Sequence, residues 1–211
     1  MIPANVTVVS NPIVDDALSH IRSKDTGVQQ FRYFSERLCR QLISNSILKK
    51  DTSSVDIETP IKLTTGRQIT DNFVVVVILR SGIAMLPSVL DMLPDASVGY
   101  AGIYRDEKNA TAHEYYWKLP PITSKDTILI VDPMLATGGT ILHVIKRIIP
   151  ENPKEIRIIS VVSTIFGIKK IQKSYSDVKF IVASIDQGLN DKKYIVPGLG
   201  DFGDRYFGTT T

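Results

Sequence analysis

The chain has 211 residues, of which 43% are hydrophobic and 22% charged, and this composition excludes a disordered or fibrous protein. Its net charge of +3 is too small to indicate nucleic-acid binding by itself. The longest apolar run, residues 73–79, is far shorter than the roughly 20 residues that a membrane helix needs. With one cysteine, Cys39, and no signal-peptide pattern, we expect a single cytoplasmic domain over residues 1–211.

Two helices are predicted in the first quarter of the chain. Asn11 followed by Pro12 is typical of a helix start, because asparagine caps free N–H groups and proline suits the first helical turn. Apolar residues recur at helical spacing as far as Ile21, and a second helix is predicted over residues 28–47. We interpret the apolar face of the second helix as a packing surface within the core or between subunits.

From residue 73 onward, strands and helices alternate. The runs rich in β-branched residues predict strands that are buried on both faces. The predicted strands are 73–79, 98–104, 127–131, 156–162 and 179–185, and the predicted helices are 83–93, 140–149 and 167–175. This alternation predicts an α/β fold with a parallel sheet flanked by helices. Ligands of such folds bind beyond the carboxyl ends of the strands, so the segments that follow the strands are the candidates for a site.

Two segments interrupt the alternation. Residues 51–72 are polar and extended in pattern. Residues 105–121 begin with polar residues and end with aromatic ones. The second segment is interpreted either as a two-stranded arm or flap, or as an ordinary surface hairpin.

The strongest chemical signal follows the predicted strand 127–131. Asp132 stands at the strand end, and Thr-Gly-Gly-Thr, residues 137–140, opens a helix. Free N–H groups at a helix start bind anions, and glycine lets a phosphate approach the backbone closely. A carboxylate instead accepts hydrogen bonds from ribose hydroxyl groups. The combination predicts a sugar-phosphate site, which we favour over a plain strand–turn–helix connection.

This segment, ILIVDPMLATGGT, resembles the phosphoribosyl pyrophosphate (PRPP) motif of type I phosphoribosyltransferases. The proline that follows Asp132 makes this motif similar to that of the uracil phosphoribosyltransferase branch of the family. Other segments resemble motifs of the same branch, namely ILRSG, YRDE, YYWKLP and the C-terminal residues 189–208. The resemblance covers about residues 11–208. It implies a type I phosphoribosyltransferase-like fold with a flap at about 104–121 and a small uracil-binding hood at about 189–208. It also implies a pyrimidine salvage reaction in which uracil and PRPP give UMP and pyrophosphate.

The resemblance further implies roles for individual residues. The catalytic residues are implied to be Arg80, Arg105 and Asp201. Those implied to bind PRPP are Arg80, Arg105, Asp132, Pro133, Met134, Leu135, Ala136, Thr137, Gly138, Gly139, Thr140 and Asp201. Those implied to bind uracil, largely through backbone groups, are Ile195, Gly200, Asp201 and Phe202. Arginine suits pyrophosphate because its planar guanidinium group offers a fork of donors.

The expected cofactor is Mg²⁺, carried mainly by PRPP and without a direct protein ligand, because Mg²⁺ commonly binds substrate phosphates and retains waters. The family resemblance also implies a homodimer or homotetramer and, in some members, activation by GTP. If GTP binds, the candidates are Arg32, Tyr33 and Arg37 on the second helix. No membrane or nucleic-acid partner is expected.

Two alternative functions remain open from the sequence. One is a related enzyme that uses orotate or a purine in place of uracil. The other is a regulatory protein of the same fold that senses PRPP or a nucleotide and binds RNA. The G-x-G-x-x-G pattern at residues 198–203 is not interpreted as a dinucleotide site, because Pro197 interrupts any preceding strand and too few residues follow.

Overall fold

The computed structural model describes residues 2–48, 50, 52–105 and 112–209, without the side chains of Arg105 and Ala112. Within these ranges, eight strands form one sheet in the order β1-β10-β9-β7-β4-β5-β6, with β8 paired to β9. The strands of this sheet are β1 (Val6–Val8), β4 (Asn72–Leu79), β5 (Ser97–Arg105), β6 (Ala112–Lys118), β7 (Asp126–Val131), β8 (Met134–Leu135), β9 (Glu155–Thr164) and β10 (Lys179–Asp186). All neighbours are parallel except β5 and β6, which confirms the predicted α/β fold with an added antiparallel edge.

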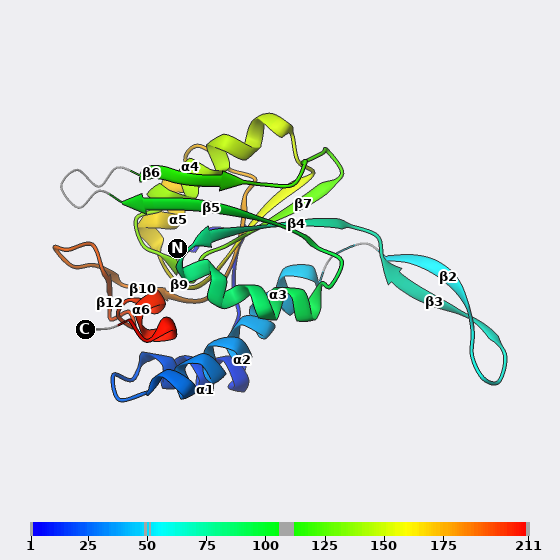
Figure 1. The fold of residues 1–211 in the computed structure, drawn as a ribbon, viewed down its shortest axis with the longest axis horizontal. Helices are drawn as coiled ribbons and strands as arrows, with labels where there is room; N and C mark the ends of the chain where they lie inside the picture. The colour runs from blue at the N-terminus through cyan, green and yellow to red at the C-terminus, as the bar shows by residue number, and fades with distance from the viewer. Residues whose placement is uncertain (1, 49, 51, 106–111, 210–211) are drawn as a thin grey trace.

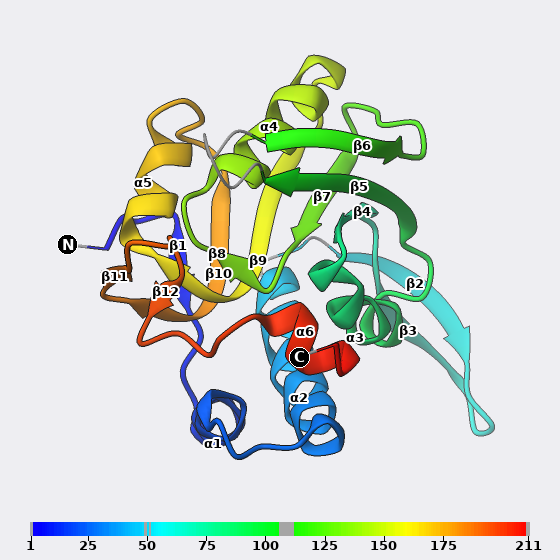
Figure 2. The same ribbon diagram turned by 60° about the vertical axis from the view of Figure 1, so that its left-hand side comes forward.

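Helices cover both faces of the sheet (Figures 1 and 2). The helices are α1 (Pro12–Arg22), α2 (Val28–Ile47), α3 (Leu86–Met92), α4 (Gly139–Ile148), α5 (Ile165–Gln172) and α6 (Phe202–Phe207), with 3₁₀ turns η1 (Ser81–Met85) and η2 (Ile149–Glu151). α4 and α5 lie on one face, whereas α1, α2 and α3 lie on the other (Figure 2). As predicted, Asn11 caps α1 by accepting hydrogen bonds from the N–H groups of Ile13 and Val14.

Alternation along the central strands builds a separate apolar core on each face of the sheet. In β4, Val75 and Val77 pack toward α2 and α3, whereas Val74 and Val76 pack toward α4. All four side chains are almost fully buried. This burial on both faces explains why the parallel strands read as continuous β-branched runs.

The polar segment 51–72 contains an antiparallel hairpin that projects from one end of the sheet (Figure 1). Its strands are β2 (Thr52–Glu58) and β3 (Leu63–Ile69). Buried ion pairs hold the base of the hairpin, because Lys50 Nζ lies 2.7 Å from Glu155 Oε2 and 3.6 Å from Asp71 Oδ1. The two chain segments that flank the hairpin are therefore tied to each other and to β9.

The predicted flap corresponds to the antiparallel strands β5 and β6. Their pairing starts deeper in the sheet than predicted, with Tyr100 opposite Lys118, and it shifts register between Gly102 and Ile103. The tip, residues 106–111, lies outside the described residues. The strands flanking it stand at the end of the sheet opposite the β2–β3 hairpin (Figure 1).

Several short elements were not predicted. They are β1, β8, the small antiparallel pair β11 (Gly188–Leu189) and β12 (Ile195–Val196), and α6. Each has six residues or fewer, so its own sequence carries little periodicity, and the short strands among them are specified by the strands with which they pair. Among the described residues, no helix is long and apolar enough to cross a membrane.

Candidate active site

Asp132 directly follows β7 and lies at the carboxyl edge of the sheet. Its carboxylate is buried, and its Oδ1 atom accepts hydrogen bonds from the Ser81 hydroxyl group at 3.1 Å and from the Met134 N–H at 3.3 Å. Ser81 begins η1 two residues after the last residue of β4, the strand next to β7. Two parallel strands therefore deliver a carboxylate and a hydroxyl group to the same point, as the position of the predicted site requires.

The pKa of the Asp132 carboxylate is higher than that of an ordinary aspartate. Burial raises its pKa, and the negative charge of Asp201 raises it further. The hydrogen bonds from Met134 and Ser81 lower it but do not compensate, so the pKa of Asp132 lies at about 6. A buried carboxylate with a perturbed pKa next to a second carboxylate is typical of a functional site.

The predicted phosphate cradle, residues 137–140, forms the turn into α4. Gly138 has φ of +74°, the left-handed region that glycine adopts readily. A Cβ atom at Gly138 would lie 2.8 Å from the carbonyl oxygen of Gly167, so this position also requires close backbone contact. Gly139 opens α4, and the Gly138 position before it offers no capping side chain, although the Gly139 N–H donates a long hydrogen bond of 3.5 Å to Thr137 Oγ1. Because this bond is long and therefore weak, the N–H groups in the first turn of α4 can turn to an anion.

The turn between Asp132 and the cradle is fixed against β9 and α5. The Pro133 carbonyl accepts hydrogen bonds from the N–H groups of Val161 and Val162, and the Ala136 carbonyl accepts one from the Thr164 hydroxyl group. Of the residues predicted to bind PRPP, Met134 and Leu135 form β8 along β9. The Leu135 side chain is buried in the core on the α4 side, so this residue can offer a ligand only backbone groups.

Arg80 lies at the carboxyl end of β4, beside Ser81. Its side chain is 66% exposed, and its Nη2 atom is 3.6 Å from Asp204 Oδ1. An exposed pair at this distance is weak. The guanidinium group of Arg80 can therefore exchange this carboxylate for pyrophosphate oxygens.

The C-terminal loop, residues 197–201, follows β12 and leads into α6. The Val196–Pro197 peptide is cis, and Gly198 has φ of +58°. Gly200 is exposed, and among the residues that the structure describes none forms a hydrogen bond with its backbone. The predicted uracil contacts at Ile195 and Phe202 have buried side chains, so they too would act through backbone groups.

The C-terminal loop meets the other parts of the site at the start of α6. Asp201 caps α6 by accepting a hydrogen bond from the Asp204 N–H at 2.9 Å. Behind it, a Cβ atom at Gly203 would lie 3.7 Å from Ser81 Cβ. The charge of Asp201 also acts on Asp132. The structure thus brings Arg80, Asp132 and Asp201, which are widely separated in the sequence, to one edge of the sheet.

The remaining predicted residues are Arg105 and the three candidates for binding GTP. Arg105 ends β5, but its side chain is not among the groups that the structure describes. Among the GTP candidates, Arg32 donates to the Tyr206 carbonyl and Arg37 pairs with Asp16 at 2.6 Å. Tyr33 is 62% exposed. Both arginines on α2 therefore already have partners within the chain.

The described part of the site contains carboxylates that are too few to form a metal cage. In the described ranges, no group of three or more His, Cys, Asp or Glu side chains could hold a metal ion. Asp201 is exposed beside the weak Arg80–Asp204 pair. A Mg²⁺ ion carried by PRPP fits this donor set, because Mg²⁺ typically retains waters and binds one or two carboxylates in addition to substrate phosphates.

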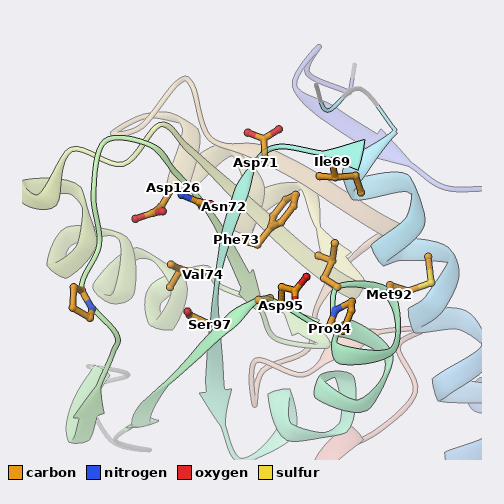
Figure 3. Close-up of a pocket in the computed structure, with 13 residues that line it drawn as sticks. Ile69, Asp71, Asn72, Phe73, Val74, Met92, Pro94, Asp95, Ser97 and Asp126 are labelled. Carbon is orange, nitrogen blue, oxygen red and sulfur yellow. The ribbon is translucent and has the colours of Figure 1, made fainter. Parts of the chain in front are cut away.

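A cavity of about 360 Å³ lies at the end of the sheet opposite the candidate site, near the start of β4 (Figure 3). Its polar lining includes Asp71 and Asp126. Asp126 accepts hydrogen bonds from the N–H and hydroxyl groups of Thr123, and Asp71 pairs with Lys154. These carboxylates serve the fold, and none of the predicted site residues lines the cavity.

Sequence reasoning missed several residues that shape the site. Thr164 and Gly167 fix the cradle from β9 and α5, and Arg22 and Asp186 contact the C-terminal loop. The position of Asp186 at the end of a predicted strand is the one signal that could have identified it. Thr164, Gly167 and Arg22 gave no local signal, because their partners are distant in the sequence.

Known proteins match this chain over nearly its full length. Residues 8–209 match the family model described as uracil phosphoribosyltransferase. Proteins named uracil phosphoribosyltransferase from Campylobacter concisus and Fervidobacterium nodosum are 38% and 40% identical over 205 and 203 residues. These matches cover 97% and 96% of this chain, and 99% and 98% of the relatives.

Solved structures agree with these relatives. The structure of the AQ2163 protein from Aquifex aeolicus superposes with a TM-score of 0.92 at 31% identity, covering 98% of this chain and 99% of that one. An adenine phosphoribosyltransferase from Trypanosoma brucei, at 13% identity, covers 95% of this chain and 90% of its own with a TM-score of 0.59, which shows a shared fold. The family match, the identities and the shared fold together establish that this chain belongs to the uracil phosphoribosyltransferase family.

Proposed function

We propose that this protein transfers the phosphoribosyl group of PRPP to uracil, giving UMP and pyrophosphate in pyrimidine salvage. The observation that carries the proposal is the convergence of two half-sites at one edge of the sheet. The cradle and Asp132 suit a ribose 5-phosphate, and the C-terminal loop presents backbone groups that no described residue pairs and that suit a flat base. Membership of the uracil phosphoribosyltransferase family supports this pairing of substrates.

In the proposed complex, the N–H groups at the start of α4 hold the 5′-phosphate, aided by the hydroxyl groups of Thr137 and Thr140. Asp132 accepts hydrogen bonds from the ribose hydroxyl groups. Its anchoring by Ser81 and Met134 leaves the second oxygen, Oδ2, for the sugar. PRPP is thus fixed at both ends of its ribose, which positions the C1′ carbon for attack.

The base occupies the space beside the C-terminal loop. Uracil presents two carbonyl acceptors with one N–H donor between them. Backbone groups of Gly200 and the Phe202 N–H have no partner among the described residues and can match this pattern. Backbone donors and acceptors cannot exchange roles, so the loop distinguishes bases by their hydrogen-bond pattern.

In the reaction, N1 of uracil bonds to C1′ as the bond from C1′ to the pyrophosphate oxygen breaks. The electron pair leaves with pyrophosphate, and the N1 proton is released. Arg80 stabilises the negative charge that develops on the leaving group, and we assign Arg105 the same task. Mg²⁺ carried by PRPP and contacted by Asp201 would neutralise part of that charge. The strands β5 and β6 carry the flap, which we propose closes to exclude water from the activated sugar.

Further features belong to the same proposal. We retain one domain over residues 1–211, with the flap at about 104–121 and the hood at about 189–208. We also propose that the protein is cytoplasmic, that it forms a homodimer or homotetramer, and that GTP activates it by binding around Arg32, Tyr33 and Arg37. The alternative, a regulatory protein that binds RNA, is not favoured by the relatives, which are named as transferases.

The proposal is tested by measuring kcat/KM for uracil, 5-fluorouracil and cytosine with saturating PRPP and Mg²⁺. Uracil and 5-fluorouracil should be used, because position 5 takes no part in the hydrogen bonds. Cytosine presents a donor at C4 and an acceptor at N3, and each unpaired buried group costs about 1–3 kcal/mol, so it should be rejected by roughly 10⁴-fold. Orotate and adenine serve as controls for the related enzymes. Turnover of cytosine within about tenfold of uracil would contradict the assignment of the C-terminal loop.

A further inference from the structure

We propose that Arg22 and Asp186 are a positioning pair that fixes the C-terminal loop and thereby sets the affinity and selectivity for the base. This inference rests on the proposed function. Arg22 is the last residue of α1, and Asp186 is the last residue of β10. The two lie 164 residues apart in the sequence and meet beneath the loop.

The pair has the geometry of a strong ionic contact. Arg22 Nη1 lies 2.8 Å from Asp186 Oδ2, and Arg22 Nη2 lies 2.6 Å from Asp186 Oδ1. Such a two-point contact fixes the orientation of both planar groups. Ser184 strengthens the arrangement, since its hydroxyl group donates to Asp186 Oδ1 at 2.7 Å and accepts from Arg22 Nη2 at 3.0 Å.

Both members of the pair also bind the same residue of the loop. The Gly198 carbonyl accepts a hydrogen bond from Arg22 Nη1 at 2.6 Å, and the Gly198 N–H donates to Asp186 Oδ2 at 2.8 Å. A Cβ atom at Gly198 would collide with the Ile195 carbonyl oxygen, so this tight turn accepts only glycine. The ionic pair therefore holds the loop at its sharpest bend.

Arg205 completes the attachment from the other side. Its guanidinium group donates to the carbonyl of Leu199 at 2.7 Å and to the carbonyls of Ile21 and Ser23, on either side of Arg22. It also lies over the Phe31 ring at 4.4 Å. The end of α1 and the C-terminal loop are thus joined by two arginines.

These contacts divide the loop into used and unused backbone groups. The N–H and carbonyl groups of Gly198 and the carbonyl of Leu199 are bound to Arg22, Asp186 and Arg205. The next residue, Gly200, has no backbone partner among the described residues. The pair thereby fixes which groups remain for the base and where they point.

Burial and charge indicate that the pair is ionised and costly to disturb. The Asp186 side chain is 3% exposed, and that of Arg22 is 24% exposed. Burial alone would raise the pKa of Asp186, but the hydrogen bonds from Arg22, Ser184 and Gly198 outweigh it and hold the pKa below its ordinary value. Removing one partner would leave the other charge buried and unpaired.

The test compares Arg22→Gln, Arg22→Lys and Asp186→Asn with the parent protein. The measurements are KM for uracil at saturating PRPP, KM for PRPP at saturating uracil, and the ratio of kcat/KM for uracil and cytosine. Loss of a charge-assisted contact should raise KM for uracil at least about tenfold in Arg22→Gln and Asp186→Asn, whereas KM for PRPP stays within about twofold. The uracil-to-cytosine ratio should fall in the same two variants. Arg22→Lys keeps the charge but loses the fork, so it should lie between these variants and the parent.

The control is Arg40→Gln, which breaks an exposed pair with Asp91 at 2.8 Å and should change neither KM. If Arg22→Gln and Asp186→Asn do not fold, Ser184→Ala takes their place, because it removes one hydrogen bond from each member of the pair. It should likewise raise KM for uracil and leave KM for PRPP nearly unchanged. Parent turnover with unchanged uracil KM in the variants, or an equal rise in both KM values, overturns this inference and leaves the proposed function standing. Absence of UMP formation by the parent overturns the proposed function and this inference together.

Discussion

At the scale of single residues, Asp132 shows how function and stability compete. The carboxylate that we propose to bind ribose lies where two hydrogen bonds from described residues compensate its burial. The nearby charge of Asp201 adds to the cost of ionisation. Functional groups held in unfavourable surroundings are a recurring source of the trade-off between stability and activity.

Asp132→Asn should therefore make the protein more stable and less active at pH 7.5. Folding raises the pKa of Asp132 from the ordinary aspartate value of 3.8 to about 6, so its ionisation lowers stability as the pH rises through this interval. The variant should gain about 1–3 kcal/mol in the free energy of unfolding at pH 7.5, and the gain should vanish near pH 4. Urea unfolding at the two pH values measures this difference.

The same variant should lose at least about tenfold in kcat/KM for PRPP, because an amide has one acceptor where the carboxylate has two. Asp56→Asn on the exposed face of β2 is the control and should change neither quantity. A variant that is less stable than the parent at pH 7.5 would show that the Asp132 charge is better compensated than the contacts indicate.

At the scale of elements, the start of α4 separates two glycines with different tasks. Gly138 is required by its own backbone, since it combines a φ of +74° with close contact to Gly167. Gly139 has no such constraint, because the nearest atom to its Cβ would be Thr137 Oγ1 at 3.6 Å. The chain thus tolerates a side chain at residue 139, whereas a phosphate in the cradle would not.

Gly139→Ala should fold as stably as the parent and bind PRPP about tenfold or more weakly, because its methyl group occupies the approach of the phosphate. Gly138→Ala is the matched comparison and should lose about 1–3 kcal/mol of stability through backbone strain and the contact with Gly167. Melting temperature and calorimetric PRPP affinity separate the two effects. Parent-like PRPP binding by Gly139→Ala would place the phosphate elsewhere.

The flap provides a second prediction at this scale. Arg105 ends β5, where the chain leaves the sheet. Arg105→Ala should lose about 2–4 kcal/mol of transition-state stabilisation in kcat/KM with little change in melting temperature, because one electrostatic contact to pyrophosphate is removed. Lys125→Ala, an exposed charge at the opposite edge of the sheet, is the control. Loss of folding together with full specific activity of the folded fraction would mark Arg105 as structural.

At the scale of the whole molecule, different features lie at the two ends of the sheet (Figure 1). The carboxyl end carries the cradle, the flap strands and the C-terminal loop. The other end carries the β2–β3 hairpin, whose outward side chains include Ile61 at 89% exposure and Leu63 at 73%. Exposed apolar side chains on a projecting hairpin are typical of a protein interface.

The hairpin should contribute to the proposed homo-oligomer. The double variant Ile61→Asp/Leu63→Asp should have a lower molar mass in solution than the parent, because charges would replace the apolar contacts of the interface. Multi-angle light scattering at matched concentrations measures this change, with Phe166→Asp on α5 as an exposed apolar control. A monomeric parent, or a variant of unchanged mass, would contradict this role of the hairpin.

The sequence by itself determined the features that depend on neighbours along the chain. The β-branched runs specified strands buried on both faces, Asn11 and Pro12 specified the start of α1, and residues 28–47 specified α2 with the observed bounds. The Asp132 and Thr-Gly-Gly-Thr pattern specified the strand end and the helix start that the structure shows within these nine residues, and its binding of phosphate stays a prediction.

Only the tertiary structure decided the properties that depend on distant partners. The raised pKa of Asp132 requires burial and the charge of Asp201, and the cradle at Gly138 requires the carbonyl of Gly167. The support of the C-terminal loop by Arg22 and Asp186 joins residues 164 positions apart. Local sequence constrains the backbone through steric and hydrogen-bonding preferences of adjacent residues, whereas desolvation, ion pairing and close packing depend on groups that meet only when the chain has folded.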